Sequence, residues 1–396
     1  MKRLLIYSQD GMGLGHLRRT RNIAREVLAM QPECQVLAVA DAPDAPFFAR
    51  LPGMEFLKLP TIVKAGRAGW RTHASSMEVK DVVSRRSAMI LEAFEEFQPD
   101  AVLVDHMPVG VEGELKPTLE SATRKRPRPS LYLGLRDILD TPETIHEAWT
   151  ELSAYDYLPE YDTVLIHGCR EIYDAEAVYG LGAHVRTLRY NNYVAPAQRT
   201  TAHAQTTSEP FVLAMGGGGA DAFPLAKTFL EAMPAILRET PLHAVLLTGP
   251  NMPPAERDVL VAEARKYPVD VQTSSQDATT LLQKASAVVT MGGYNTLCEV
   301  LTWQAKAVVV PRSGPSAEQR IRSRLFAERG LIRTLEPESL TPSRLAEELL
   351  ELLANGHELP KTANIPPLDG ARRAAELLVG AAVAEGAAVA TDAVSS

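Results

Sequence analysis

Short segments that are apolar at every position alternate along this chain with amphipathic segments of helical period. A strand that is apolar on both faces is buried on both faces, and alternation of such strands with helices is typical of parallel sheets built from β-α-β units. The sequence therefore predicts an α/β protein. The expected strands are 3–8, 35–40, 101–105, 131–135 and 163–167, then 211–215, 244–248, 287–290 and 307–311; the expected helices are 17–30, 79–97, 225–238, 255–266, 296–304 and 345–353.

The alternation is interrupted once, at residues 195–209, which read APAQRTTAHAQTTSE. This segment is polar and has no apolar period, which is typical of a linker. On each side of it the chain begins again with a strand, a glycine-rich loop and a helix. We therefore expect two Rossmann-like domains with parallel sheets, at residues 1–194 and 210–380. The low-complexity residues 381–396 are expected to form a disordered tail.

Charge and composition narrow the classes of partner. Lys and Arg number 41 against 49 Asp and Glu, a net charge of −8, whereas a nucleic-acid-binding protein should present a basic surface. No segment approaches the about 18 consecutive apolar residues of a membrane-spanning helix, and the N-terminus does not resemble a signal peptide. The three cysteines, at positions 34, 169 and 298, do not have metal-binding spacing. We expect a cytoplasmic protein that binds no nucleic acid and no metal.

Three glycine-rich loops each follow an expected strand and precede an expected helix: GMGLGH at 11–16, MGGGGAD at 215–221 and MGGYNT at 291–296. Glycine lets the backbone approach a ligand closely, and the next helix presents free N–H groups to an anion. The loops therefore indicate phosphate binding, with tight strand–helix packing as the structural alternative. The first loop does not match the dinucleotide fingerprint G-x-G-x-x-G, and Asp41 after the second strand is a poor candidate for a ribose contact, so NAD is not expected.

The third loop belongs to a longer pattern. GGYNTLCEV at 292–300, KAVVVP at 306–311 and the pair Glu318-Gln319 resemble the C-terminal domain of family 28 glycosyltransferases, typified by the bacterial lipid-linked GlcNAc transferase of peptidoglycan synthesis. GMGLGH resembles the N-terminal glycine loop of that family, and the glycines at 216–219 resemble its middle loop. The resemblance implies a GT-B fold, in which the sheets of two domains face each other across a cleft. It also implies that the C-terminal domain binds a nucleotide-sugar donor and the N-terminal domain an acceptor, without a further cofactor.

The resemblance also implies roles for single residues. Glu299 would bind the ribose hydroxyls, Glu318 and Gln319 the donor sugar, and His16 would act as catalytic base. The polar segment 273–275 stands where the family tends to be apolar, so uridine is only the default nucleotide. The residues expected to contact the donor are Gly13, Gly15, Gly217, Gly218, Gly292, Gly293, Asn295, Thr296, Glu299, Glu318 and Gln319.

The positions of Glu299 and His16 in the sequence agree with these roles. Glu299 follows Asn295 and Thr296 by four and three positions, so all three lie on one helix face beside the glycine turn. His16 lies near a helix start, where the positive end of the dipole disfavours imidazolium and keeps a neutral base. A glutamate that only stabilises its helix, and a histidine bonded to backbone, are the structural alternatives.

No Asp-x-Asp motif stands at a strand end in a donor position. We therefore expect a metal-independent, inverting displacement that transfers a hexose. His16 would take the proton of the acceptor hydroxyl, while helix N-termini stabilise the departing diphosphate.

Two further motifs end strands of the N-terminal half, VDHMP at 104–108 and GLRDILD at 134–140. The carboxyl ends of parallel strands line the ligand crevice of open α/β sheets. We expect Asp105 to orient the His16 imidazole, and Arg136 and Asp137 to bind the acceptor. Trp70 is expected to offer a platform for the acceptor. Capping, ion pairing and anchoring of a loop are the structural alternatives for these residues.

Other functions remain open. The first loop, the Asp105-His106 pair and the Met-Gly-Gly turn near Asp221 are also similar to the UDP-sugar hydrolase of pseudaminic acid synthesis, in which a histidine activates water. A nucleotide-sugar 2-epimerase and a non-catalytic nucleotide-sugar-binding protein share the two-domain plan. The acceptor is left open between a lipid-linked and a small molecule. The apolar residues of 47–52 beside Arg50 suggest contact with a membrane surface, with a core-facing helix end as the alternative.

Overall fold

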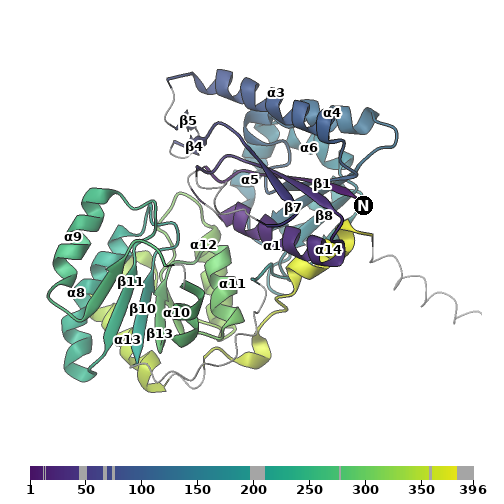
Figure 1. Cartoon of the computed structure of the whole chain (residues 1–396). Coiled ribbons are helices and arrows are strands. Elements are labelled where there is room, and N and C mark those ends of the chain that lie inside the picture. The colour runs from purple at the N-terminus through teal and green to yellow at the C-terminus, as the bar shows by residue number, and fades with distance from the viewer. Residues whose placement is uncertain are drawn as a thin grey trace, which may run out of the picture. The chain divides into compact units, whose positions relative to one another are not determined.

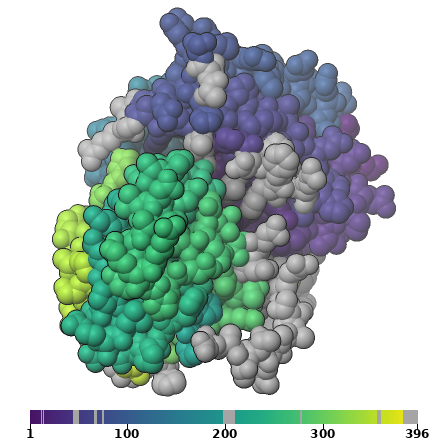
Figure 2. Space-filling model, turned by 60° about the vertical axis from the view of Figure 1, so that its left-hand side comes forward, coloured from purple at the N-terminus to yellow at the C-terminus, as the bar shows by residue number. Residues whose placement is uncertain are grey.

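The computed structural model describes residues 1–11, 13, 15–43, 51–65, 69–73, 76–196, 210–275, 278–355 and 359–380. The chain divides into two compact units, Met1–Ala195 together with the described residues from Pro367 onward, and Pro196–Pro366. In the space-filling view, purple and blue residues form one body and green residues another (Figure 2). Each unit is therefore built mainly from one continuous stretch of sequence.

The first unit contains a seven-stranded parallel sheet with the order β3-β2-β1-β6-β7-β8-β9. The order reverses between β1 and β6, and the carboxyl ends of strands at such a switch point form the usual ligand crevice. The strands are β1 (Arg3–Ser8), β2 (Gln35–Ala40), β3 (Met54–Lys58), β6 (Ala101–Asp105), β7 (Ser130–Arg136), β8 (Thr163–His167) and β9 (Leu188–Tyr190). A separate antiparallel pair is formed by β4 (Ile62–Lys64) and β5 (Trp70–Thr72).

Helices cover both faces of this sheet (Figure 1). Alternate residues of β1 supply both cores: Leu5 and Tyr7 pack in the cluster with α3 (Val79–Phe97) and α4 (Lys116–Arg124), whereas Leu4 and Ile6 pack with α1 (Gly15–Met30) and α14 (Gly370–Leu378). Apolar residues at every position of the strand are needed because the two faces alternate along it. The other α-helices of this unit are α5 (Pro142–Glu151), α6 (Ala154–Tyr157) and α7 (Ala175–Val178).

The second unit repeats the plan with six parallel strands in the order β12-β11-β10-β13-β14-β15. Its switch point lies between β10 and β13. The strands are β10 (Phe211–Met215), β11 (His243–Leu247), β12 (Val269–Gln272), β13 (Ala287–Thr290), β14 (Ala307–Val309) and β15 (Arg333–Thr334). The helices are α8 (Phe223–Glu239), α9 (Pro254–Ala264), α10 (Ala278–Lys284), α11 (Tyr294–Thr302), α12 (Glu318–Glu328) and α13 (Pro342–Asn355).

All the strands expected from the sequence are present within a residue or two of their expected bounds. The sequence missed the antiparallel pair β4 and β5. It also missed the strands at the sheet edges, β3, β9, β12 and β15. Their residues are half-buried or exposed, so these strands do not show the continuous apolar run that marks a strand buried on both faces. No helix within the described ranges is long and apolar enough to cross a membrane.

The C-terminal helix corrects the expected domain boundary at residue 380. In α14, Ala371, Ala374, Ala375 and Leu378 are buried in the cluster that contains Ile23, Ala24 and Val27 of α1. Figure 1 shows this yellow helix beside α1, and the Tyr132 hydroxyl donates to the carbonyl of Leu377 at 3.2 Å. Residues 367–380 therefore belong to the first unit. The expected linker beyond residue 196 and the expected tail lie outside the described residues.

This packing predicts which unit depends on α14. Leu378→Ala removes a buried side chain that is 4% exposed, and we expect the free energy of unfolding in urea to fall by about 2–4 kcal/mol. Amide hydrogen exchange should become faster in α1 rather than in the helices of the second unit. Arg372→Ala, on the exposed face of the same helix, is the control and should change stability by less than about 0.5 kcal/mol. Faster exchange confined to α8 or α13 would contradict the assignment.

Candidate active site

The loop that follows β1 ends in a cap on α1. The Asp10 carboxylate accepts hydrogen bonds from the backbone N–H groups of His16 and Leu17, both at 2.7 Å. The N–H of Gly13 donates to the carbonyl of Asp10 at 3.0 Å. Burial raises the pKa of Asp10 to about 8. The first N–H groups of this helix are therefore already bound by a side chain of the protein itself. Donor binding by Gly13 and Gly15 stays a prediction, and this cap argues against it.

His16 and Asp105 meet at the carboxyl end of β6. The Nδ1 atom of His16 lies 2.6 Å from Oδ2 of Asp105, and the two side chains are 17% and 1% exposed. The sequence predicted this pairing, and the structure shows its geometry. A carboxylate can only accept, so this contact favours the tautomer with the proton on Nδ1 and a lone pair on Nε2. The His16 side chain is thus partly exposed, whereas its partner is buried.

Arg19, one turn beyond His16 on α1, completes this cluster. Its Nε donates to Oδ1 of Asp105 at 3.0 Å, and its Nη2 lies 2.8 Å from Oδ1 and 2.7 Å from Oδ2. The same Nη2 atom lies 2.9 Å from Nδ1 of His16. Arg19 is 1% exposed, so this is a buried ion pair in which each charge is compensated. No role for Arg19 was expected from the sequence, although its spacing of three residues from His16 places both on one face of the helix.

The protonation of the cluster follows from burial and charge. Burial by itself would raise the pKa of Asp105, but the charges of Arg19 and His16 outweigh burial and hold this pKa below its usual range. Burial lowers the pKa of His16 below its usual value. Asp105 opposes that shift, whereas the cations Arg19 and Arg136 add to it. The site therefore holds an ionised carboxylate next to a neutral imidazole at pH 7.

His106 and Arg136 extend the site along the strand ends. His106 has a positive φ of 74°, which is uncommon for a residue other than glycine. Its ring centroid lies 4.8 Å from that of His16, and its Nε2 lies 3.4 Å from Nη2 of Arg136. Burial and the charge of Arg136 lower the pKa of His106 well below its usual value. Arg136 was expected at this crevice, whereas His106 had been assigned no role.

Asp137 and Trp70 have structural contacts. Asp137 is 0% exposed, and its carboxylate accepts from the N–H of Ile138 at 2.8 Å and from the hydroxyl of Tyr193 at 3.0 Å. Acceptor binding by Asp137 stays a prediction, and the burial of its carboxylate argues against it. Trp70 lies on β5 and packs, half-buried, on the cluster of Ile62, Val82 and Val111, and its role as an acceptor platform stays a prediction. Most of the apolar segment at 47–52 lies outside the described residues.

In the second unit, the glycines of the loop after β10 are of two kinds: some pack closely against other atoms, and others face open space. A Cβ atom on Gly216 would lie 2.2 Å from Cβ of Ala222, and one on Gly219 would lie 2.4 Å from the carbonyl oxygen of Thr248. A Cβ on Gly217 would meet no atom within 4 Å, and one on Gly218 only Asn251 at 3.5 Å. The two glycines expected to approach the donor are therefore those with space in front of them.

The start of α11 differs from that of α1 because no side chain among the described residues caps it. The N-cap residue of α11 is Gly293, which has no side chain to cap the helix, and a Cβ there would meet only the Thr296 hydroxyl at 3.8 Å. Asn295, Thr296 and Glu299 lie half-buried on this helix, and a Cβ on Gly292 would lie 2.5 Å from Oγ of Ser323. This helix start has the geometry of an anion site.

The expected sugar-reading pair, Glu318 and Gln319, is buried at the start of α12, where each side chain has an internal contact. The Oε1 atom of Gln319 accepts from the N–H of Arg312 at 3.1 Å. Arg322, one turn later and 1% exposed, lies 3.5 Å from Oε2 of Glu318 and donates to the carbonyl of Gly292 at 3.3 Å. Arg322 therefore joins α12 to the glycine loop, a link that the sequence analysis missed.

Comparisons with known proteins identify the class of enzyme. Residues 212–378 match the glycosyltransferase family 28 C-terminal domain. An uncharacterized glycosyltransferase of Methanosarcina mazei is 21% identical over 388 residues, which covers 93% of this chain and 96% of the relative. The crystal structure of MurG from Acinetobacter baumannii aligns with a TM-score of 0.56 at 15% identity, over 95% of both chains. The chain is a glycosyltransferase.

The fold of this glycosyltransferase is GT-B, with two parallel-sheet domains, as the sequence predicted. A putative UDP-N-acetylglucosamine 2-epimerase from Listeria monocytogenes aligns with a TM-score of 0.65 at 16% identity, over 96% of both chains. At such identity the likeness shows the fold alone, so it does not favour epimerisation. The matched family segment contains both loops of the second unit and ends at the last residue of α14.

The buried cation beside His16 leads to a prediction about the glycosyltransferase. Arg19→Met removes a positive charge 2.9 Å from Nδ1 and leaves Asp105 uncompensated, and both changes favour imidazolium. We therefore expect the pKa of His16 to rise, and with it the pH below which a neutral base is lost. NMR titration of the His16 ring would measure this shift. Arg25→Met, on the same helix, is the control. An unchanged or lower pKa in Arg19→Met would contradict the electrostatic role of Arg19.

Proposed function

We propose that this chain is a metal-independent, inverting hexosyltransferase that moves a sugar from a nucleotide-sugar to an acceptor hydroxyl, with His16 as general base. The default donor is a UDP-sugar. The observation that carries the proposal is the 2.6 Å contact between Nδ1 of His16 and Asp105, on a ring that is partly exposed. A neutral histidine whose second nitrogen is held by a carboxylate is a common form of general base.

In the proposed step, Nε2 of His16 takes the proton of the acceptor hydroxyl as its oxygen attacks the anomeric carbon of the donor. The bond from that carbon to the diphosphate breaks on the opposite side, so the configuration inverts and the electron pair leaves with the diphosphate. Asp105 stabilises the imidazolium that forms, and Arg19 holds Asp105 ionised. The lowered pKa of His16 keeps the base neutral near pH 7 before the step.

The second unit would supply the donor site. Gly217 and Gly218 and the start of α11 from Gly293 would bind the diphosphate, since the glycines leave space and the helix start lacks a side-chain cap. Glu299, one turn further along α11, would accept hydrogen bonds from the ribose hydroxyls. Glu318 and Gln319 would recognise the sugar, as the family resemblance implies. Since His16 belongs to the first unit, the proposal requires both units for turnover.

The acceptor is proposed as a hydroxyl compound, lipid-linked or small, that lies at the carboxyl ends of β6 and β7 near His106 and Arg136. To use a lipid-linked acceptor, this protein, proposed to be cytoplasmic, would contact the membrane surface. Within the described residues the helices offer no membrane span, so such contact would be peripheral.

The first test compares wild type with His16→Ala on a panel of UDP-, GDP-, dTDP- and ADP-sugars, with cell extract as the source of acceptor. His16→Ala should lower kcat by about 10²–10⁴-fold without weakening donor binding, because the base acts only on the reacting proton. The control is His146→Ala, an exposed histidine of α5. Rapid release of sugar without acceptor, lost in His16→Ala, would replace the transferase by a hydrolase that uses the same base on water.

A second variant tests the donor site. Glu299→Ala should weaken binding of the nucleotide-sugar by about 10-fold or more, because ribose hydroxyls would lose a charged acceptor. Isothermal titration with a UDP-sugar measures this loss, and Glu256→Ala in the first turn of α9 is the matched control. Equal affinity of Glu299→Ala and wild type for the UDP-sugar would show that Glu299 does not bind the donor. Tight binding with no turnover in any extract would instead indicate a non-catalytic binding protein.

A further inference from the structure

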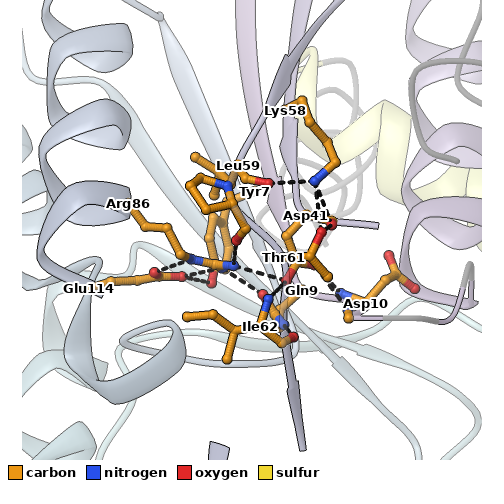
Figure 3. A network of polar contacts seen from close by, with 12 residues as sticks. Tyr7, Gln9, Asp10, Asp41, Lys58, Leu59, Thr61, Ile62, Arg86 and Glu114 are labelled. Atoms are coloured by element: carbon orange, nitrogen blue, oxygen red, sulfur yellow. Dashed lines mark hydrogen bonds and ion pairs between the residues drawn. The ribbon is translucent and has the colours of Figure 1, made fainter. Parts of the chain in front are cut away.

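A buried polar network surrounds Arg86 of α3, beneath the carboxyl ends of β1 and β2 (Figure 3). Arg86 is 0% exposed. Its Nε and Nη2 donate to the Glu114 carboxylate at 2.6 and 2.7 Å, and its Nη1 donates to Oδ2 of Asp41 at 2.9 Å. Tyr7 adds a hydrogen bond to Glu114 at 2.5 Å. We call Tyr7, Gln9, Asp41, Arg86 and Glu114 the Arg86 network.

The two carboxylates of the network have different neighbours. Among the described residues, the Glu114 carboxylate accepts from the side chains of Arg86 and Tyr7. Asp41 accepts from the backbone: its Oδ1 lies 3.1 Å from the N–H of Asp10 and 2.9 Å from that of Gly11. Asp41 is thus the member that holds the loop leading into α1, and Figure 3 shows Arg86 between the two carboxylates.

A second set of contacts fixes the other side of the same loop. Oδ2 of Asp41 accepts from the N–H of Ile62 at 3.2 Å, and the Gln9 amide donates to the carbonyl of Ile62 at 3.2 Å. Gly11 has a φ of +59°, and a Cβ on it would lie 3.1 Å from that carbonyl oxygen. The backbone of residues 9–11 is therefore held between Asp41 and the strand β4.

Asp10 links this loop to His16. Its backbone N–H donates to the Asp41 carboxylate, and its own side-chain carboxyl group accepts from the backbone N–H of His16 at 2.7 Å. A shift of the loop would move this cap and the first turn of α1, which carries the imidazole. The Asp105 carboxylate would then meet the ring at a different distance.

We infer that Asp41, oriented by Arg86, is a positioning residue for His16. The inference rests on the proposed role of His16 as base, and it assigns Asp41 a function that is neither a ribose contact nor stabilisation alone. Within the described residues, the Glu114 carboxylate compensates the charge of Arg86 without a hydrogen bond to the backbone of residues 9–11, so charge compensation alone does not require such bonds. Asp41 and Glu114 therefore form a natural pair for comparison.

The experiment compares Asp41→Asn with Glu114→Gln in the full chain. Each variant removes one negative charge from the Arg86 network, so both should lose a similar amount of stability in urea. In Asp41→Asn we expect kcat per folded molecule to fall about 10- to 100-fold with the donor KM within about 2-fold, because misplacing a catalytic group by about 1 Å costs this much. Glu114→Gln should keep kcat within about 3-fold of wild type.

A second measurement does not depend on turnover. NMR signals of the His16 ring in the ligand-free protein should shift, and its pKa should change, in Asp41→Asn but not in Glu114→Gln. If Asp41→Asn does not fold, Asp41→Glu, which keeps the charge but displaces the carboxylate, should give the same pattern. Unchanged ring signals in the Asp41 variant, or equal kcat losses in both variants, would overturn the inference. Turnover retained in His16→Ala would instead refute the proposed function and leave the ring measurement valid.

Discussion

The buried pairing of arginine with carboxylate is the interaction on which both units depend. Among the described residues, the three largest fully buried side chains are those of Arg19, Arg86 and Arg322. A buried cation is costly unless a carboxylate and hydrogen-bond acceptors compensate it, so each arginine constrains the position of its partners. The partners are Asp105 for Arg19, Asp41 and Glu114 for Arg86, and Glu318 with the Gly292 carbonyl for Arg322.

Each of these pairs lies where strands end and helices begin, which is where an α/β sheet forms its ligand crevice. Apolar packing alone tolerates small shifts of a helix along a sheet, whereas an arginine bound at two or three atoms allows little movement. The bonds of Arg19 to Asp105 therefore hold the carboxylate that His16, which follows a glycine-rich segment, meets at 2.6 Å.

Similar sequence patterns in the two units have different structural outcomes. The loops before α1 and α11 both follow a strand and contain several glycines, and the sequence alone assigned phosphate binding to both. In the structure Asp10 caps α1, whereas the N-cap of α11 is a glycine. The cap depends on a carboxylate six residues before the first N–H that it binds, and no local rule for caps includes that spacing. The packing of α14 was missed for a similar reason. Its small residues contact α1, which is distant in the sequence, only in the folded protein.

The sequence by itself determined the α/β class, the buried strands, the two units and the pairing of His16 with Asp105, because continuous apolar runs, glycine loops and strand ends are local signals. Tertiary structure decided the features that depend on contacts distant in the chain. These are the less buried strands, the return of α14, the clamp of Arg19 on Asp105 and the bonds of Asp41 to the first loop. Asp41 shows the reason: its role depends on Arg86 and Ile62, 45 and 21 residues away, which only folding brings to the same carboxylate.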